Sequence, residues 1–299
     1  MTRVVFHVGL SKTGTTALQD DVFPAIAGIR YLGPKGAAPG DRVTAAAARR
    51  IGRALEHETR RVVDAPYAGL LRARDHVMGL GGTVLFSEEA LTTNTGVETT
   101  GYDRIPLMPG AIAGLFPDAA VVLVLREPSD HLASLLLQRM ASQPLVRGID
   151  RPRPLTPRQQ LDWHVLRGRR RDPLSIFSTM MRFDRTVALF RERFGPDRFH
   201  LLAYERLFAP ARPEWRAAFA AILGVPVEVP DPGRRNVGDD ERRRTIAERF
   251  FAGPDETPAA DAWIAAMRAA PQAIAEHGPV QRFIALHCRE PWQAAMAAP

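Results

Sequence analysis

Cysteine and lysine are the scarcest of the chemically informative residues in this 299-residue chain. The single cysteine, Cys288, excludes an internal disulfide, and no spacing of cysteine and histidine indicates a structural zinc site. The eight histidines are scattered and form no H-E-x-x-H motif, so we expect no bound metal. The two lysines are Lys12 and Lys35, and arginine supplies nearly all of the positive charge. A lysine inside a motif is therefore unusual for this chain.

Long apolar runs are also missing. No segment approaches the roughly 18 consecutive apolar residues of a membrane span, and the N-terminus leads directly into a strand-like segment without a signal-peptide core. We therefore expect a soluble, cytoplasmic protein without a membrane span. The length and a hydrophobic content of 45% suit one large domain, 1–299, in which 239–299 is a helical C-terminal extension.

The chain has a formal net charge of +7, which favours polyanionic partners. It has no recognisable DNA- or RNA-binding motif and few aromatic residues near its arginine clusters, so we expect no nucleic-acid partner. A basic protein that binds polyanions without catalysis stays open as an alternative. The oligomeric state does not follow from the sequence.

The most informative stretch is residues 3–18, RVVFHVGLSKTGTTAL. Its first residues predict a short buried strand, Gly9–Thr16 a turn, and Ala17–Phe23 a helix. This order presents backbone N–H groups and a helix N-terminus to an anion, and Lys12 adds a full positive charge. The predicted phosphate-binding residues are Ser11, Lys12, Thr13, Gly14, Thr15 and Thr16.

The loop differs from that of ATPases and GTPases, which reads G-x-x-x-x-G-K-[ST]. Gly9 and Gly14 have the right spacing, but Thr15 stands at the lysine position and Lys12 comes two residues before Gly14. A nucleotide kinase or NTPase is therefore an alternative that lacks its key residue. A plain strand–turn–helix with a surface lysine is the other alternative.

Further buried strands are predicted near 29–32, 83–87, 120–125 and 198–203. Helical patterns lie at 44–79 with a break at Pro66, near 111–116, after a Ser129 N-cap, at 159–168, 178–194 and 212–223, and in the last sixty residues. This alternation predicts an α/β, P-loop-like three-layer fold, with a central parallel sheet of about five strands and helices on both faces. Ligands bind beyond the carboxyl ends of such strands, where the loop, Glu88, Glu89 and Arg126 all lie.

Two of these motifs resemble those of sulfotransferases that use PAPS (3′-phosphoadenosine 5′-phosphosulfate). K-T-G-T-T-A-L, Lys12–Leu18, is similar to the family's 5′-phosphosulfate loop, above all in heparan N-sulfotransferase domains and bacterial carbohydrate-type relatives. Val121–Ser134 resembles the 3′-phosphate motif, a strand that ends in Arg with a Ser eight residues on. Weaker matches are Phe194–Gly195, Leu201–Leu207 and Arg234–Gly238.

The resemblance implies transfer of a sulfuryl group from PAPS to an acceptor hydroxyl or amine, with adenosine 3′,5′-bisphosphate as product. It implies that Lys12 stabilises the leaving phosphate and that Arg126 and Ser134 hold the 3′-phosphate. By itself, Arg126 could equally be a surface residue paired with Glu127. The nucleotide-binding set implied by the later motif is Arg234, Arg235 and Asn236.

The acceptor must lose a proton, so a general base is expected beside the sulfuryl group. Related carbohydrate sulfotransferases use a Glu after the third strand, which implies Glu89 or, in the other register, Glu88 as the base. The second acid would then only favour a helix start. His131 and His164 are remoter candidates. The segments 92–110 and 141–176 would contact a small-molecule or carbohydrate acceptor, whose anionic character their arginines suggest, and 141–158 would form a loop over the site.

Overall fold

The computed structural model describes residues 1–33, 41–92, 104–142, 155–170, 175–178, 180–208, 214–229, 243–245, 247–248, 251 and 257–298. Its five strands are β1 (Thr2–His7), β2 (Ile29–Leu32), β3 (Gly82–Ser87), β4 (Ala120–Leu125) and β5 (Phe199–Ala203). They form one sheet in the order β2-β3-β1-β4-β5, in which each neighbouring pair is parallel. The predicted parallel sheet and the position of each predicted strand are confirmed.

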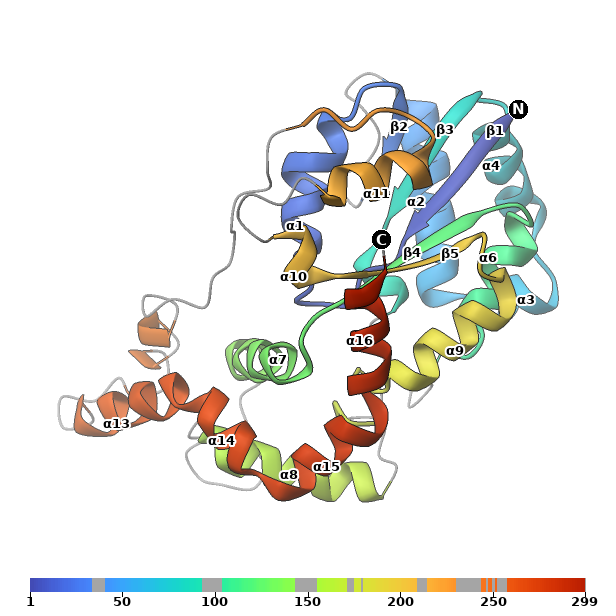
Figure 1. Ribbon diagram of the computed structural model, residues 1–299. Coiled ribbons are helices and arrows are strands. Elements are labelled where there is room, and N and C mark those ends of the chain that lie inside the picture. Colours follow the sequence, from blue (N-terminus) through green and yellow to red (C-terminus); the bar gives the residue numbers. More distant parts are fainter. Residues whose placement is uncertain are drawn as a thin grey trace.

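Helices connect the strands and cover the sheet (Figure 1). Between β1 and β3 lie α1 (Thr15–Ala17), η1 (Leu18–Val22), η2 (Phe23–Ala25), α2 (Arg42–His57), α3 (Thr59–Asp64) and α4 (Ala68–Met78). Between β3 and β5 lie η3 (Glu89–Leu91), α6 (Met108–Leu115), α7 (Pro128–Ser142), α8 (Pro157–Arg169) and α9 (Phe183–Phe194). After β5 follow α10 (Tyr204–Leu207), α11 (Glu214–Leu223), α13 (Thr257–Arg268), α14 (Ala270–Glu276), α15 (Gly278–His287) and α16 (Arg289–Ala297).

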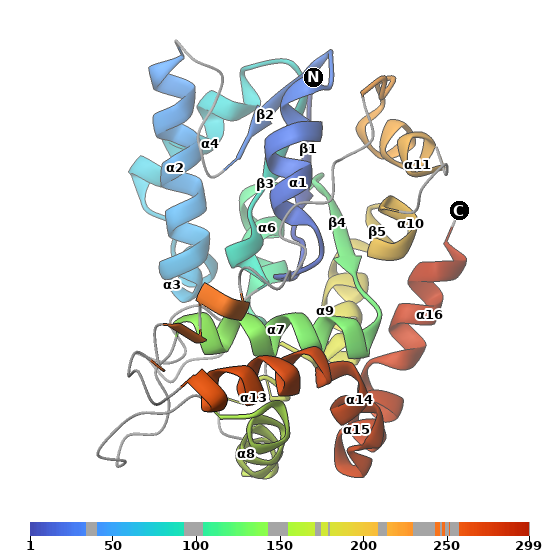
Figure 2. The same cartoon turned by 90° about the vertical axis from the view of Figure 1, so that its left-hand side faces the viewer.

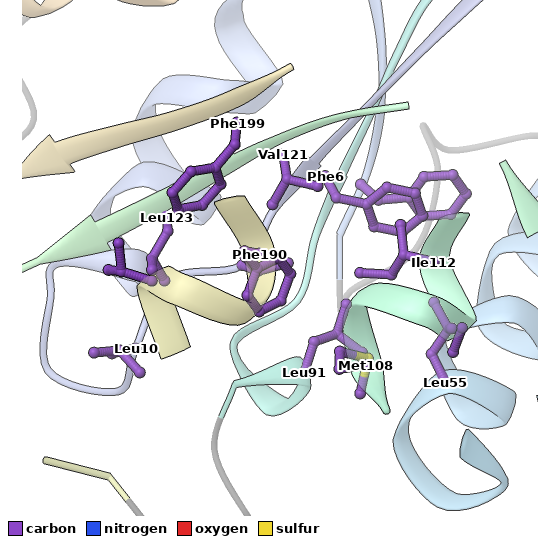
Figure 3. Packing of buried hydrophobic residues seen from close by; sticks show 14 of the residues in the cluster. Phe6, Leu10, Leu55, Leu91, Met108, Ile112, Val121, Leu123, Phe190 and Phe199 are labelled. Atoms are coloured by element: carbon purple, nitrogen blue, oxygen red, sulfur yellow. The ribbon is translucent and has the colours of Figure 1, made fainter. Parts of the chain in front are cut away.

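Both faces of the sheet are buried. Along β1, Val4 and Phe6 join one hydrophobic cluster with residues of α2, α4, α6 and α9, whereas Val5 joins a second cluster with the η1–η2 segment and α11. Figure 3 shows the first cluster, in which Phe6 and Val121 of the sheet face Ile112 of α6 and Phe190 of α9. Because side chains alternate along a strand, this pattern requires helices on both faces, as predicted.

Several helix boundaries differ from the prediction. The pattern at 44–79 forms three helices, since a break at Glu58 precedes the predicted one near Pro66. The predicted helix at 178–194 begins only at Phe183. Before it, the hydroxyl of Ser175 donates to His164 O and accepts from Phe177 N, which holds residues 175–178 in a turn. Such local side-chain bonds compete with helix formation.

The C-terminal helices pack along α7, α8, α9 and the edge strand β5 (Figure 2). Ile274, Val280, Ile284 and Ala295 belong to the same hydrophobic cluster as Val4 and Phe6 of the sheet. A single domain with a C-terminal helical extension stays a prediction, which this shared cluster supports. In the part of the chain that the structure describes, no helix combines the length and hydropathy that a membrane span needs.

Candidate functional site

The carboxyl ends of β1, β3 and β4 lie side by side at one edge of the sheet. His7 at the end of β1 is in register with Ser87 at the end of β3 and with Val122 of β4. The loop of residues 8–14, the acidic turn of Glu88 and Glu89, and Arg126 leave the sheet at these ends. Residues that are more than a hundred positions apart in the sequence are thereby brought to the place where ligands bind in parallel α/β sheets.

The loop after β1 is held in an unusual conformation. Lys12 has a φ of 69°, and among the described residues no other non-glycine residue has a positive φ. The hydroxyl of Thr13 donates to the carbonyl of Leu10 at 2.6 Å, and the amide of Leu18 donates to the carbonyl of Gly14 at 3.1 Å. Left-handed backbone costs a side-chain-bearing residue roughly 1–2 kcal/mol, and such strain gathers at functional sites.

The threonines of this loop have different environments. Thr13 and Thr15 are buried, and their hydroxyl oxygens lie 3.4 Å apart, so both contribute to the shape of the loop. Ser11 is also buried. Thr16, in the first turn of the helix, is exposed and is the hydroxyl of this set most accessible to a ligand.

Gly14 lies against two aromatic rings, those of Tyr204 and Phe208. Its φ is 77°, and a Cβ placed on it would lie 2.2 Å from Cε2 of Phe208 and 2.9 Å from Cε2 of Tyr204. The two rings also contact each other, with centroids 4.6 Å apart. The loop therefore approaches α10 so closely that no side chain fits between them.

Replacing Gly14 with Ala should lower the free energy of unfolding by roughly 2–4 kcal/mol, since the strain of a positive φ adds to overpacking against Phe208. Gly81 is a matched control, because its φ is 70° and a Cβ there meets no atom within 4 Å. Gly81→Ala should cost only the conformational part, about 1–2 kcal/mol. Urea unfolding of both variants measures the difference, and equal losses would contradict the contact with the aromatic rings.

Arg126, at the end of β4, is fixed by three contacts. Its Nη1 donates to the carbonyl of Lys12 at 3.3 Å, its guanidinium stacks 4.7 Å above the ring of Tyr204, and its Nη2 lies 3.9 Å from a carboxylate oxygen of Asp130. Its Nε–H is buried and has no hydrogen-bond partner among the described residues. The side chain is 22% exposed. Because part of the side chain is exposed, an anion can reach a guanidinium that directly contacts the loop.

Glu127 does not pair with Arg126, and Ser129 is not the N-cap of α7 as predicted. The helix begins at Pro128, and a carboxylate oxygen of Glu127 accepts from the amide of Asp130 at 2.8 Å. Glu127 therefore occupies the N-cap position, where a carboxylate satisfies an otherwise unpaired N–H. Ser134 is half-buried on α7, four residues after Asp130, and so lies on the same side of the helix as the neighbour of Arg126.

Glu88 and Glu89 have different electrostatic surroundings. Burial raises the pKa of Glu89 to about 7, the charge of Lys12 acts in the opposite direction, and Glu88 adds to the rise. Burial, and then the charges of Asp20 and Glu88, raise the pKa of the Tyr31 hydroxyl. The charge of Lys12 therefore acts on Glu89, and a pKa of about 7 suits a general base at neutral pH.

Thr92 ties the acidic turn to the phosphate loop, a role that the sequence did not indicate. Its buried hydroxyl lies 2.9 Å from the carbonyl oxygen of Gly9 and 3.2 Å from that of Val8, and it is a donor to both. Its own amide donates to Glu89 O at 3.3 Å. The position of Glu89 relative to the loop is thereby fixed.

A second network that sequence reasoning missed lies behind the loop. Nδ1 of the buried His7 is 2.8 Å from the hydroxyl oxygen of Ser87, which also accepts from Nε2 of Gln19 at 3.0 Å. Burial lowers the pKa of His7 to about 3, so its ring is neutral. The network joins the ends of β1 and β3. In the sequence, the only indication of this network is a polar residue at the end of each strand, His7 in β1 and Ser87 in β3.

Both histidines that were considered as bases are buried. Burial, and then the charges of Arg126 and Lys12, lower the pKa of His131 to about 3. His164 lies on α8, where its carbonyl accepts from the hydroxyl of Ser175 at 2.7 Å. Glu89 has the pKa better suited to a base at neutral pH.

Some predictions fall outside the described residues. These are the nucleotide-binding residues Arg234, Arg235 and Asn236, together with most of the acceptor segments 92–110 and 141–158. Within the described ranges, no three His, Cys, Asp or Glu side chains gather as metal ligands would.

No protein-family model matches the sequence, and neither does any curated protein. Among solved structures, the chain is similar to a sulfotransferase from Alicyclobacillus acidocaldarius, at 17% identity, a TM-score of 0.48 and coverage of 88% of this chain and 98% of that one. It is also similar to the mouse sulfotransferase SULT7A1 complexed with PAP, at 11% identity, a TM-score of 0.41 and coverage of 87% and 89%. Both are sulfotransferases, the family that the motifs resemble. At these identities the likeness concerns the fold.

Proposed function

We propose that this chain is a sulfotransferase that moves a sulfuryl group from PAPS to a hydroxyl or amine of a small-molecule or carbohydrate acceptor and releases adenosine 3′,5′-bisphosphate. One observation carries the proposal. Two cations, Lys12 and Arg126, and an acid with a pKa of about 7, Glu89, come together at neighbouring strand ends. Two separate anion-binding groups and a base are what transfer from a doubly phosphorylated nucleotide requires.

The roles of the residues follow from their chemistry. Lys12 and the amides of the first helical turn bind the 5′-phosphosulfate, and Lys12 stabilises the charge that grows on the 5′-phosphate as the sulfur–oxygen bond breaks. Arg126, with Ser134, binds the 3′-phosphate. Glu89 accepts the proton of the acceptor while the new bond to sulfur forms. The leaving electron pair thus ends on the 5′-phosphate and the proton on the carboxylate.

Other segments of the chain would complete the nucleotide site and bind the acceptor. We assign Arg234, Arg235 and Asn236 to the closing of the nucleotide site, and 92–110 and 141–176 to the acceptor. An anionic acceptor would suit the arginines of the second segment. A cytoplasmic location belongs to the same proposal.

Calorimetric titration with adenosine 3′,5′-bisphosphate is the direct test. We expect binding at least about tenfold tighter than that of adenosine 5′-phosphate, because a charge-assisted contact of the 3′-phosphate with Arg126 contributes about 1.5–3 kcal/mol. Radiolabelled PAPS should then reveal the acceptor in a screen of sugars, lipids, phenols and amines. No affinity for the bisphosphate, together with turnover of ATP, would instead support a nucleotide kinase or NTPase.

A further inference from the structure

The short helix α10 lies where the nucleotide site meets the C-terminal helix. Tyr204, its first residue, lies under the guanidinium of Arg126, and Phe208, directly after the helix, contacts Gly14 of the loop. Arg206 reaches the other way, since its Nη1 donates to the carbonyl of Met296 near the end of α16 at 3.4 Å. Figure 2 shows α16 running up to α10 at this end of the molecule.

Glu205 lies between Tyr204 and Arg206 in the sequence, and each of its two carboxylate oxygens accepts a hydrogen bond from a different element. Oε1 accepts from the backbone amide of Glu127 at 2.6 Å, and Oε2 accepts from the indole Nε1–H of Trp292 on α16 at 3.0 Å. The amide of Glu127 belongs to the peptide bond that follows Arg126. The carboxylate therefore fixes the point of the backbone from which Arg126 extends.

The indole N–H also has an electrostatic effect. Glu205 is a carboxylate beside a tyrosine over which Arg126 is stacked, and the Nε–H of Arg126 is buried and has no partner among the described residues. A carboxylate oxygen without a donor would compete with a bound phosphate for that guanidinium. Because both oxygens of Glu205 are bonded to N–H groups, Glu205 does not add a second carboxylate to Asp130, whose Oδ2 lies 3.9 Å from Nη2 of Arg126.

Building on the proposed function, we propose that Trp292 and Glu205 are positioning residues that adjust Arg126 for the 3′-phosphate. The C-terminal helix is thereby part of the selectivity for a 3′-phosphorylated nucleotide. Trp292 and Glu205 do not touch the ligand; they act through the backbone and the guanidinium of Arg126.

Calorimetry of the full chain with adenosine 3′,5′-bisphosphate and with adenosine 5′-phosphate tests the proposal. Trp292→Phe keeps the packing of the ring and removes only the N–H, so we expect bisphosphate affinity to fall about tenfold, the cost of a weakened charge-assisted bond. The affinity for adenosine 5′-phosphate should change by no more than about twofold, because this nucleotide has no 3′-phosphate for Arg126 to bind. Trp263→Phe is the matched control, because the buried Nε1–H of Trp263 on α13 has no hydrogen-bond partner in the described structure.

Glu205→Gln supplies a second variant with the same expected selectivity loss. Its amide carries one acceptor oxygen, whereas both partners of Glu205 are donors. The double variant with Trp292→Phe should lose less than the sum of the two single losses, since the residues act through one contact. Equal loss of both nucleotides, or none, would overturn the positioning role. Failure of the unchanged protein to prefer the bisphosphate would overturn the proposed function itself.

Discussion

Lys12→Met should reduce the kcat of sulfuryl transfer about 10²–10³-fold and weaken the binding of adenosine 3′,5′-bisphosphate. Methionine keeps most of the length of the side chain but removes the charge that would neutralise the leaving phosphate. Lys12 is the only lysine in the described part of the chain. Steady-state transfer from radiolabelled PAPS and calorimetry measure the two losses.

The strained backbone of Lys12 makes this prediction more specific. Lys12→Gly removes the same charge but relieves the cost of a φ of 69°. We therefore expect Lys12→Gly to lose transfer as Lys12→Met does while its melting temperature is unchanged or raised. Arg53→Met, at an exposed position on α2, controls for the loss of one positive charge. Normal transfer by Lys12→Met would remove Lys12 from the mechanism.

The sheet and the strand-end residues were predictable because they depend on short-range patterns. Val4, Val5 and Phe6 form an apolar run that only burial on both faces explains, and each such run ends at a polar or charged residue. In a parallel sheet with helical crossovers, all of these ends lie at one edge. The sequence therefore predicts that Arg126 and the acidic pair lie beside the loop.

The contacts that adjust the site could not be predicted, because they join residues far apart in the sequence. Glu205 and Trp292 are 87 positions apart, and His7 and Ser87 are 80 apart. The periodic sequence patterns of helices and strands do not indicate contacts between residues so far apart. Ser129 was predicted as the cap of α7, but the helix begins at Pro128 and Glu127 caps it, because sequence patterns define helix boundaries poorly. Two adjacent acids in a sequence also do not reveal that burial raises the pKa of Glu89 to about 7.

Glu89→Gln should lower kcat about 10²–10⁴-fold, the usual contribution of a general base. A base works only when ionised, and the pKa of Glu89 is raised to about 7. For the unchanged protein, kcat/KM should therefore rise with pH, reach half of its plateau near pH 7 and fall about tenfold per unit well below it. The low rate that remains in Glu89→Gln should not show this inflection. Transfer rates between pH 5 and 9 measure both curves.

Glu88→Gln is the matched control for this prediction. It should keep most of the activity, because the proposal assigns the proton transfer to Glu89, whose pKa is raised to about 7. Since Glu88 contributes to the raised pKa of Glu89, its removal should move the inflection of kcat/KM to lower pH. A large loss of rate in Glu88→Gln, with little change in Glu89→Gln, would make Glu88 the base.

Stability should change in the opposite direction to activity in Glu89→Gln. A carboxyl whose pKa is raised in the folded state binds its proton more tightly there than in the unfolded chain, so its contribution to stability is lost as the pH rises toward about 7. Glutamine cannot ionise and avoids this loss. Glu89→Gln should therefore melt at a higher temperature than the unchanged protein at pH 8 and show little difference at pH 5. A higher melting temperature together with a much lower kcat in Glu89→Gln would show that this carboxylate is retained for chemistry rather than for stability.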